Sequence, residues 1–332
     1  MQKNILVITL SNIGDAILTL PVLDILKDQF EDAKINVIAS ERSACVFEDN
    51  PDIAGLIVYN KDWLLKDKIK FILSLRKNNY DLIVDLRNTY LPFFLKGKNK
   101  TSVFSHLTNK KSHMSSKHIQ VLKTVLDKGS LNIPSNHKAF LVLKQDIAHV
   151  SSLLESNNIL ENQFIVIAPG ARSHLKRWPE DKFTQLCDMI IEDLKTDVVL
   201  VGDVNDSVIC RRVLFNSKHD FLDLSGKTTL RQLAALLLKA KLLITNDSAT
   251  LHLASYFNVP VLAIFGPTDE NKYGPWSDKS LVAKKNINCR PCSEAECKLS
   301  SVDCLYNLSA EEVFSGIKKL LNDIQTNFSS QN

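Results

Sequence analysis

The stretch NILVITLSNIGDAILTLPVLDILK, residues 4–27, decides the class of fold. Its first seven residues are mainly apolar, which is typical of a strand buried on both faces of a parallel sheet. After the polar turn 11–14, apolar side chains recur at helical spacing from Asp15 to Phe30. A buried strand that leads through a short turn into a helix is half of a βαβ unit, so an α/β fold is expected.

The same alternation of strands and helices continues along the chain in two series. The first has further strand-like runs at residues 35–39, 56–59 and 82–84, and the second has them at 164–168, 198–201, 221–224, 242–245 and 261–265. Two series predict two Rossmann-like doubly wound domains, formed by residues 1–158 and 159–332. Ligands bind such folds at the carboxyl ends of the strands, so the residues that follow each strand are the informative ones.

The length and composition agree with this organisation. At roughly 150 residues per domain, a chain of 332 residues suggests two domains. Hydrophobic residues at 45% and charged residues at 23% exclude a disordered, collagen-like or fibrous chain. The longest charge-free run, Ser248–Thr268, contains His252 and two prolines, so no membrane span is expected. With no secretory signal and seven cysteines, an odd number, the expected compartment is the cytoplasm.

Positive charge is concentrated in the first half of the chain. Residues 1–150 hold 21 Lys and Arg against 15 Asp and Glu, a net +6, whereas the remainder holds 20 against 22, a net −2. Residues 86–126 contain eight Lys or Arg and no acid. Two interpretations fit this pattern: a surface for an anionic partner, or a solvated face without a function.

Several common sequence motifs are absent. The chain has no G-x-G, and therefore neither the dinucleotide fingerprint nor the phosphate-binding P-loop, so no cofactor is expected. It also has no D-x-D pair, the motif of metal-bridged diphosphate sites in one large class of glycosyltransferases, and no bound metal is expected at a diphosphate. Neither G-x-S-x-G nor H-E-x-x-H occurs, which argues against serine-hydrolase and zinc-protease chemistry.

The first candidate site follows the opening strand. Asp15 lies beside Gly14, which lets another molecule approach the backbone closely. A carboxylate at the start of a helix can cap that helix, or it can act as a general base toward a bound hydroxyl. Both interpretations of Asp15 stay open from its position alone.

Two loops of the second half carry the remaining candidates. The loop 170–179 (GARSHLKRWP) places Arg172, Lys176 and Arg177 ahead of a helix, where cations and free amides suit a diphosphate, although it could also be a charged surface loop. In the segment 246–252 (NDSATLH), Asp247 and Ser248 are expected to cap a helix. Backbone amides near Ala249 would face a ligand. His252 lies one turn further, where a lone histidine is more often structural than a ligand contact.

A cysteine cluster lies near the end of the chain, with the spacing C-x2-C-x4-C-x6-C. Four thiolates within 16 residues could hold zinc or form a redox-sensitive staple, or the cysteines could be reduced or partly paired structural residues. The cluster consists of Cys289, Cys292, Cys297 and Cys304.

Taken together, the motifs NIGDAILTLPVLDILK, PGARSHLKRWP, TNDSATLHLA and FGPTD resemble those of the ADP-heptose:lipopolysaccharide heptosyltransferases, glycosyltransferase family 9. The resemblance covers nearly the whole chain. It implies a GT-B fold, in which two Rossmann-like domains face each other across a cleft. The first domain takes the acceptor, the second takes the nucleotide sugar, and the last helix is expected to pack back on the first domain.

The resemblance also implies roles for single residues. Asp15 matches the catalytic base, Lys176 the lysine that contacts the donor diphosphate, and Asp247 the aspartate that contacts the donor sugar. The other expected donor contacts are Gly170, Arg172, Thr228, Ser248, Ala249 and His252. The expected acceptor contacts are Ser11, Asn12, Gly14, Arg87, Lys96 and Lys98. The chain departs from some family members at Ala171 and Arg172, and Asp206 is the nearest match to an acidic nucleoside contact.

The implied reaction is a metal-independent, inverting transfer of a heptose or related sugar from an ADP-sugar to a lipopolysaccharide core acceptor. The implied partner is an anionic, lipid-linked saccharide reached by peripheral contact with the inner membrane, and no nucleic acid is expected. Two other functions remain open at this stage. The chain could be a hydrolysing nucleotide-sugar epimerase, or a GT-B binding protein without turnover.

Overall fold

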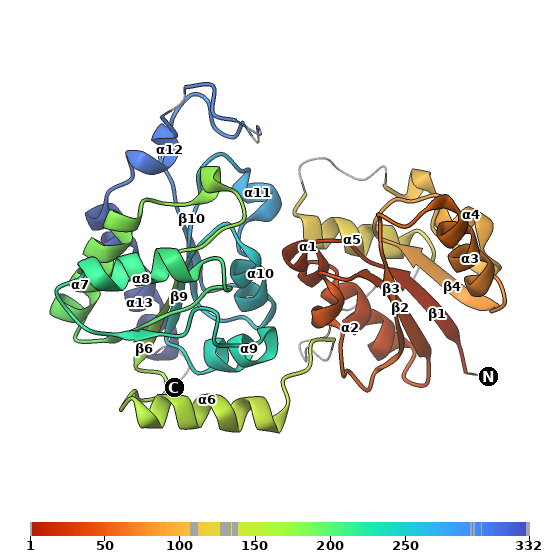
Figure 1. Ribbon diagram of the computed structural model, residues 1–332, viewed down its shortest axis with the longest axis horizontal. Coiled ribbons are helices and arrows are strands. Elements are labelled where there is room, and N and C mark those ends of the chain that lie inside the picture. Colours follow the sequence, from red (N-terminus) through yellow and green to blue (C-terminus); the bar gives the residue numbers. More distant parts are fainter. Residues whose placement is uncertain are drawn as a thin grey trace. The chain divides into compact units, whose positions relative to one another are not determined.

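The computed structural model describes residues 2–106, 112–126, 134, 139–292, 294, 296–299 and 301–329 of the chain. The chain forms two compact units, Met1–Leu141 and Val142–Asn332 (Figure 1). The boundary therefore lies before helix α6 (Lys144–Ser156) and not at residue 158, where the sequence pattern placed it. The reason is that α6 packs on α9 (Leu230–Leu238), and the two helices share an ion pair between Arg231 and Asp146.

The first unit contains a five-stranded parallel sheet in the order β3-β2-β1-β4-β5. The central position of β1 explains why its residues Ile5, Leu6 and Val7 are completely buried. The strands are β1 (Asn4–Ile8), β2 (Lys34–Ser40), β3 (Ile53–Tyr59), β4 (Tyr80–Asp85) and β5 (Gly97–Lys100).

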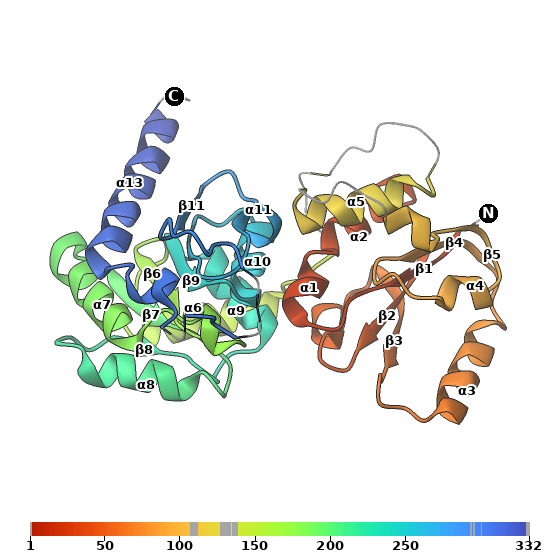
Figure 2. The ribbon, with the colours of Figure 1, turned by 90° about the horizontal axis from the view of Figure 1, so that it is seen from above.

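Helices cover both faces of this sheet (Figure 2). Side chains of α3 (Leu65–Leu75) and α4 (Leu91–Phe94) share one apolar cluster with Leu6, Ile8 and Ile83. On the other face, α2 (Leu20–Gln29) packs against α5 (Met114–Lys123). The short helix α1 (Ile13–Ile17) ends before α2, which has Pro21 in its first turn.

The second unit contains a six-stranded parallel sheet in the order β11-β10-β9-β6-β7-β8. When the strands are numbered from the first strand of each unit, both sheets follow the Rossmann order. In this order the later strands are added on the opposite side of the first strand, which creates a topological switch point. The strands are β6 (Phe164–Ala168), β7 (Asp197–Leu200), β8 (Leu222–Asp223), β9 (Leu242–Asn246), β10 (Val261–Ile264) and β11 (Ser280–Ala283). The prediction of two Rossmann-like domains is confirmed.

Helices α7 (Glu180–Leu194), α8 (Ser207–Asn216) and α13 (Ala310–Ser329) cover one face of the second sheet, and α9 and α10 (Ala249–Tyr256) lie on the other. The short helices are α11 (Glu270–Tyr273) and α12 (Asp303–Tyr306). The last helix, α13, packs beside α7 and buries Val313 and Phe314 in the core of its own unit (Figure 2). Packing of this helix on the first domain stays a prediction. Within the described residues, none of the helices combines the length and the apolar character that crossing a membrane requires.

Candidate active site

The side chain of Asn246 joins the loops that follow β6 and β9. These two strands are neighbours at the switch point of the second sheet. Asn246 Nδ2 donates to the carbonyl of Pro169 at 2.7 Å, and its Oδ1 accepts from the backbone N–H of Trp178 at 3.1 Å. Trp178 is itself buried, and its Nε1 donates to the carbonyl of Leu308 at 3.0 Å. These bonds hold the loop 169–178 against the end of β9.

The same two loops bring Lys176 and Asp247 together. Lys176 Nζ lies 2.6 Å from Asp247 Oδ2, and the side chains are 35% and 6% exposed. A well-covered carboxylate therefore holds an ammonium group that remains accessible at the carboxyl edge of the sheet. The sequence predicted both residues as donor contacts, and the structure places them in one ion pair.

Helix α10 begins directly after this pair, but its side-chain cap differs from the expectation. Ser248 occupies the N-cap position, yet its hydroxyl lies 3.1 Å from Thr245 Oγ1 and accepts no hydrogen bond from the helix backbone. The carboxylate of Asp247 points to Lys176 instead. The predicted side-chain cap is therefore wrong, and the amides near Ala249 at the start of an eight-residue helix are not engaged by Ser248.

His252 lies one turn into α10 and is buried. Its ring stacks on Trp276, with ring centres 5.7 Å apart and an angle of 21° between the planes. This stacking fixes the orientation of the imidazole ring. Trp276 gave no signal in the sequence, because only the fold brings it next to α10.

Two loops on the other side of β6 carry the expected nucleoside contacts. Gly170 adjoins Asp206, since a Cβ at position 170 would lie 2.1 Å from the carboxylate carbon of Asp206. Burial raises the pKa of Asp206, and the nearby guanidinium of Arg177 opposes this effect. The segment that carries Thr228 joins the same edge, because Gly226, with φ of 70°, donates to the carbonyl of Gly202 at 2.9 Å.

Not every cation of the loop 170–179 is available to a ligand. Arg177 Nε donates to the carbonyl of Ala171 at 2.7 Å, so its side chain helps to fold the loop. Arg172 is exposed on the same loop. Of the three predicted cations, Lys176 is the one that the structure places beside Asp247 and the start of α10.

In the first unit, Asp15 lies within the first turn of α1, and the N-cap position belongs to Asn12. The interpretation of Asp15 as the helix cap is therefore wrong. Its Oδ2 accepts a hydrogen bond of 2.8 Å from Asn12 Nδ2, which orients the half-buried carboxylate. The carbonyl of Ser11 accepts from Ser40 Oγ at 2.8 Å, so the turn is also tied to the end of β2.

Arg87 follows β4, the neighbour of β1 at the switch point of the first sheet. The buried Asp85 shapes this turn: its carboxylate accepts from the N–H of Arg87 at 2.9 Å and from both the N–H and the hydroxyl of Thr89 at 2.6 Å. Burial raises the pKa of Asp85, and the bonds from Thr89 and Arg87 oppose this effect. The guanidinium carbon of Arg87 lies 5.6 Å from the ring centre of Tyr59.

Lys96 and Lys98 lie at the opposite edge of the same sheet. Lys98 forms a 2.6 Å ion pair with Asp81, at the amino end of β4, and the carbonyl of Lys96 accepts from Tyr80 N at 3.1 Å. In a parallel sheet all amino ends lie at one edge, so the structure separates these lysines from Asp15 and Arg87. Their predicted contact with the acceptor has no support in this geometry.

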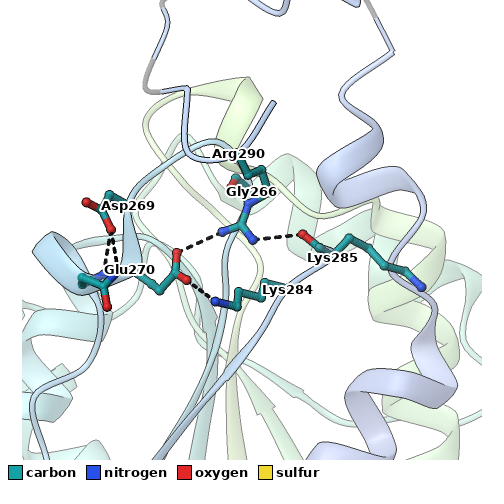
Figure 3. A network of polar contacts seen from close by, with 7 residues as sticks. Gly266, Asp269, Glu270, Lys284, Lys285 and Arg290 are labelled. Carbon is teal, nitrogen blue, oxygen red and sulfur yellow. Dashed lines mark hydrogen bonds and ion pairs between the residues drawn. The ribbon is translucent and has the colours of Figure 1, made fainter. Parts of the chain in front are cut away.

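The cysteine-bearing segment is attached to the loop after β10 through Arg290 (Figure 3). Arg290 donates to the carbonyls of Gly266 and Lys285 and to Glu270. Burial alone would raise the pKa of Glu270. The hydrogen bond from Lys284 and the positive charge of Arg290 lower this pKa below its ordinary value. Cys292 N also donates to the carbonyl of Pro267, at 3.1 Å.

The four predicted cysteines are all free thiols. Burial raises the pKa of Cys304, and the nearby guanidinium of Arg290 opposes this effect. Among the described residues, no group of three His, Cys, Asp or Glu side chains is arranged to hold a metal ion. Zinc binding by the cluster stays a prediction.

Comparison with known proteins identifies the class. The fold matches a solved glycosyltransferase family 9 protein from Veillonella parvula with a TM-score of 0.81 and 23% identity, over 97% of this chain and 98% of that one. It also matches the Escherichia coli heptosyltransferase WaaC solved with ADP, with a TM-score of 0.73 and 17% identity, over 96% and 99% of the two chains. The architecture is therefore the GT-B fold, as the sequence predicted.

The family model of glycosyltransferase family 9 (heptosyltransferase) matches residues 69–303, more than two thirds of the chain, and the protein belongs to this family. Among curated proteins, lipopolysaccharide heptosyltransferase 3 of Escherichia coli is 28% identical over 294 residues, which cover 81% of this chain and 84% of that protein. The chain is thus a glycosyltransferase, as predicted.

Proposed function

We propose that the protein transfers a heptose, or a related sugar, from an ADP-sugar to a saccharide of the lipopolysaccharide core. The observation that carries this proposal is the Lys176–Asp247 pair beside the start of α10. A cation and free amides suit the leaving diphosphate, and a carboxylate suits the hydroxyls of a sugar. The similarity to a heptosyltransferase solved with ADP supports adenine as the base.

On the donor side, Lys176 and the first amides of α10 stabilise the negative charge that develops on the departing diphosphate. Asp247 keeps the ammonium group in place and accepts hydrogen bonds from the donor sugar. Asp206 and Thr228, on the loops after β7 and β8, lie where the nucleoside binds. The protein itself supplies the positive charge at the diphosphate, so the transfer needs no metal ion.

On the acceptor side, Asp15 removes the proton of the attacking hydroxyl, and Asn12 orients its carboxylate. A bond forms between the acceptor oxygen and the anomeric carbon as the bond from that carbon to the diphosphate breaks. The diphosphate leaves with the electron pair, and the proton remains on Asp15. One displacement from the opposite face inverts the anomeric configuration.

The acceptor is an anionic, lipid-linked saccharide, which places the enzyme in the cytoplasm in peripheral contact with the inner membrane. This part of the proposal is supported by the excess of basic residues in the first half of the chain. It is also supported by the position of Arg87 at the same sheet edge as Asp15.

Transfer is expected to continue in excess EDTA at the rate seen without it, because Lys176 and the α10 amides carry out the role of a metal. The measurement is the initial rate of ADP release in the presence of donor and acceptor. An immediate loss of rate that magnesium restores would contradict the metal-independent mechanism.

Arg87→Gln is expected to raise the apparent KM for the lipid acceptor by roughly tenfold, as for a lost charge-assisted hydrogen bond, and to leave the donor KM unchanged. Lys98→Gln is the matched control, because this residue lies in the same acid-free segment but at the other edge of the sheet. Steady-state kinetics with each substrate varied separately measures both effects. An equal rise in acceptor KM for both variants would mean that charge alone, rather than position, matters.

A further inference from the structure

Three segments of the first unit expose an unusual number of large apolar side chains. They follow the ends of β3, β4 and β5, and we call them the apolar rim. The rim consists of Leu64, Leu65, Tyr90, Phe93, Phe94 and Phe104. Phe93 is 82% exposed and Phe104 is 75% exposed. Aromatic side chains of soluble proteins are normally largely buried.

The rim belongs to elements that the fold holds in one region. The rings of Phe93 and Phe94 are in contact, with centres 5.5 Å apart. The helix α4 that carries them lies on the same face of the sheet as α3, which Leu64 and Leu65 begin, and Figures 1 and 2 show the two helices side by side. Phe104 lies in the 3₁₀ helix Val103–His106, and His106 Nε2 lies 2.9 Å from the carbonyl of Asp85, which precedes α4.

The segments that carry the rim are rich in basic residues. The segment 61–77 on the β3 side carries six Lys or Arg and two Asp, and residues 86–126 on the β4 and β5 side carry no acid. On α3, Lys66 and Lys70 are exposed beside the exposed Ile69 and Leu73. Aromatic and leucine side chains with lysines around them are typical of surfaces that insert into the headgroup region of an anionic membrane.

We infer that the apolar rim is a membrane-docking surface that inserts into the interface of an anionic bilayer. The exposed rings would enter the boundary of the acyl chains, and the lysines of α3 would contact anionic headgroups. This inference deepens the proposed function, on which its purpose rests, since the segment between β4 and β5 carries both Arg87 and the exposed Tyr90, Phe93 and Phe94. Docking there would bring Arg87 toward a lipid-linked saccharide.

The test is cosedimentation of the full chain with phosphatidylcholine vesicles that either contain or lack phosphatidylglycerol, without any acceptor present. The wild type is expected to bind the anionic vesicles and to lose binding as salt rises. The double variant F93S/F104S is expected to lower the partition coefficient by at least about tenfold, because each ring loses its burial in lipid. Replacing Lys66, Lys68 and Lys70 by Gln should weaken binding and reduce its salt dependence.

The matched control is Phe215→Ser, because Phe215 is 88% exposed on α8 of the second unit. This variant should bind vesicles as the wild type does. Equal binding by the wild type and F93S/F104S, or an equal loss in Phe215→Ser, would overturn the inference. A Tyr90→Trp variant gives an independent readout, since its emission should shift to shorter wavelength on anionic vesicles only.

Activity separates this inference from the proposed function. With a soluble acceptor that lacks acyl chains, F93S/F104S should transfer sugar at the wild-type rate. Vesicle binding without any transfer would contradict the proposed function and leave the docking surface intact. Transfer to the soluble acceptor without vesicle binding would contradict the docking surface alone.

Discussion

Asp15→Asn is expected to lower turnover by roughly 10²–10⁴-fold, the usual contribution of a positioned general base. The substituted amide keeps an oxygen that can accept the hydrogen bond from Asn12 Nδ2, so α1 and its turn should fold as before. It cannot take a proton from the acceptor hydroxyl. The measurement is kcat with saturating donor and acceptor, together with the melting temperature and the affinity for ADP.

Asp28→Asn is the matched control for this substitution, because Asp28 is an exposed carboxylate on the neighbouring helix α2. It should leave kcat unchanged. Turnover near the wild-type value in Asp15→Asn would exclude Asp15 as the base. A large loss of melting temperature or of ADP affinity would instead indicate a structural role.

Lys176→Ala is expected to weaken ADP binding by roughly tenfold to hundredfold, since hydrogen bonds to charged groups contribute about 1.5–3 kcal/mol. Adenosine lacks the diphosphate, so its affinity should hardly change. The substitution also leaves the carboxylate of Asp247, only 6% exposed, without its ammonium partner, which should lower the melting temperature. Calorimetric titration with ADP and with adenosine measures the difference.

The double variant K176A/D247N separates the two roles of Lys176. Removing the charge of Asp247 should restore part of the melting temperature but not the affinity for ADP. Lys319→Ala, at an exposed position on α13, serves as the control and should change neither. An equal loss of affinity for ADP and adenosine in Lys176→Ala would place Lys176 away from the diphosphate.

The positions of the candidate site residues can be predicted because a parallel α/β fold places its ligands at the carboxyl ends of its strands. Apolar runs such as residues 4–10 and 164–168 mark those ends directly, and Asp15, Lys176 and Asp247 each follow such a run. The contacts among them could not be predicted. Lys176 and Asp247 are 71 positions apart, and only the sheet order brings their loops together.

Other features of the site could not be predicted from the sequence for the same physical reason. The charge of residues 86–126 does not indicate which edge of the sheet each lysine occupies, so the sequence does not separate Lys96 and Lys98 from Arg87. The buried Asp85, which shapes the turn of Arg87, ends an apolar strand and could have been noticed from that position. The stacking of Trp276 on His252 and the packing of α6 on the second unit depend on tertiary contacts alone.

The most direct test of heptosyl transfer is mass spectrometry of the acceptor after incubation with ADP-heptose and a lipid-linked core acceptor that lacks the sugar. We expect an acceptor heavier by one heptose unit, one ADP released for each unit transferred, and no ADP release when the acceptor is omitted. An unchanged acceptor, with ADP and free sugar released at the same rate in its absence, would contradict heptosyl transfer and favour a hydrolysing enzyme.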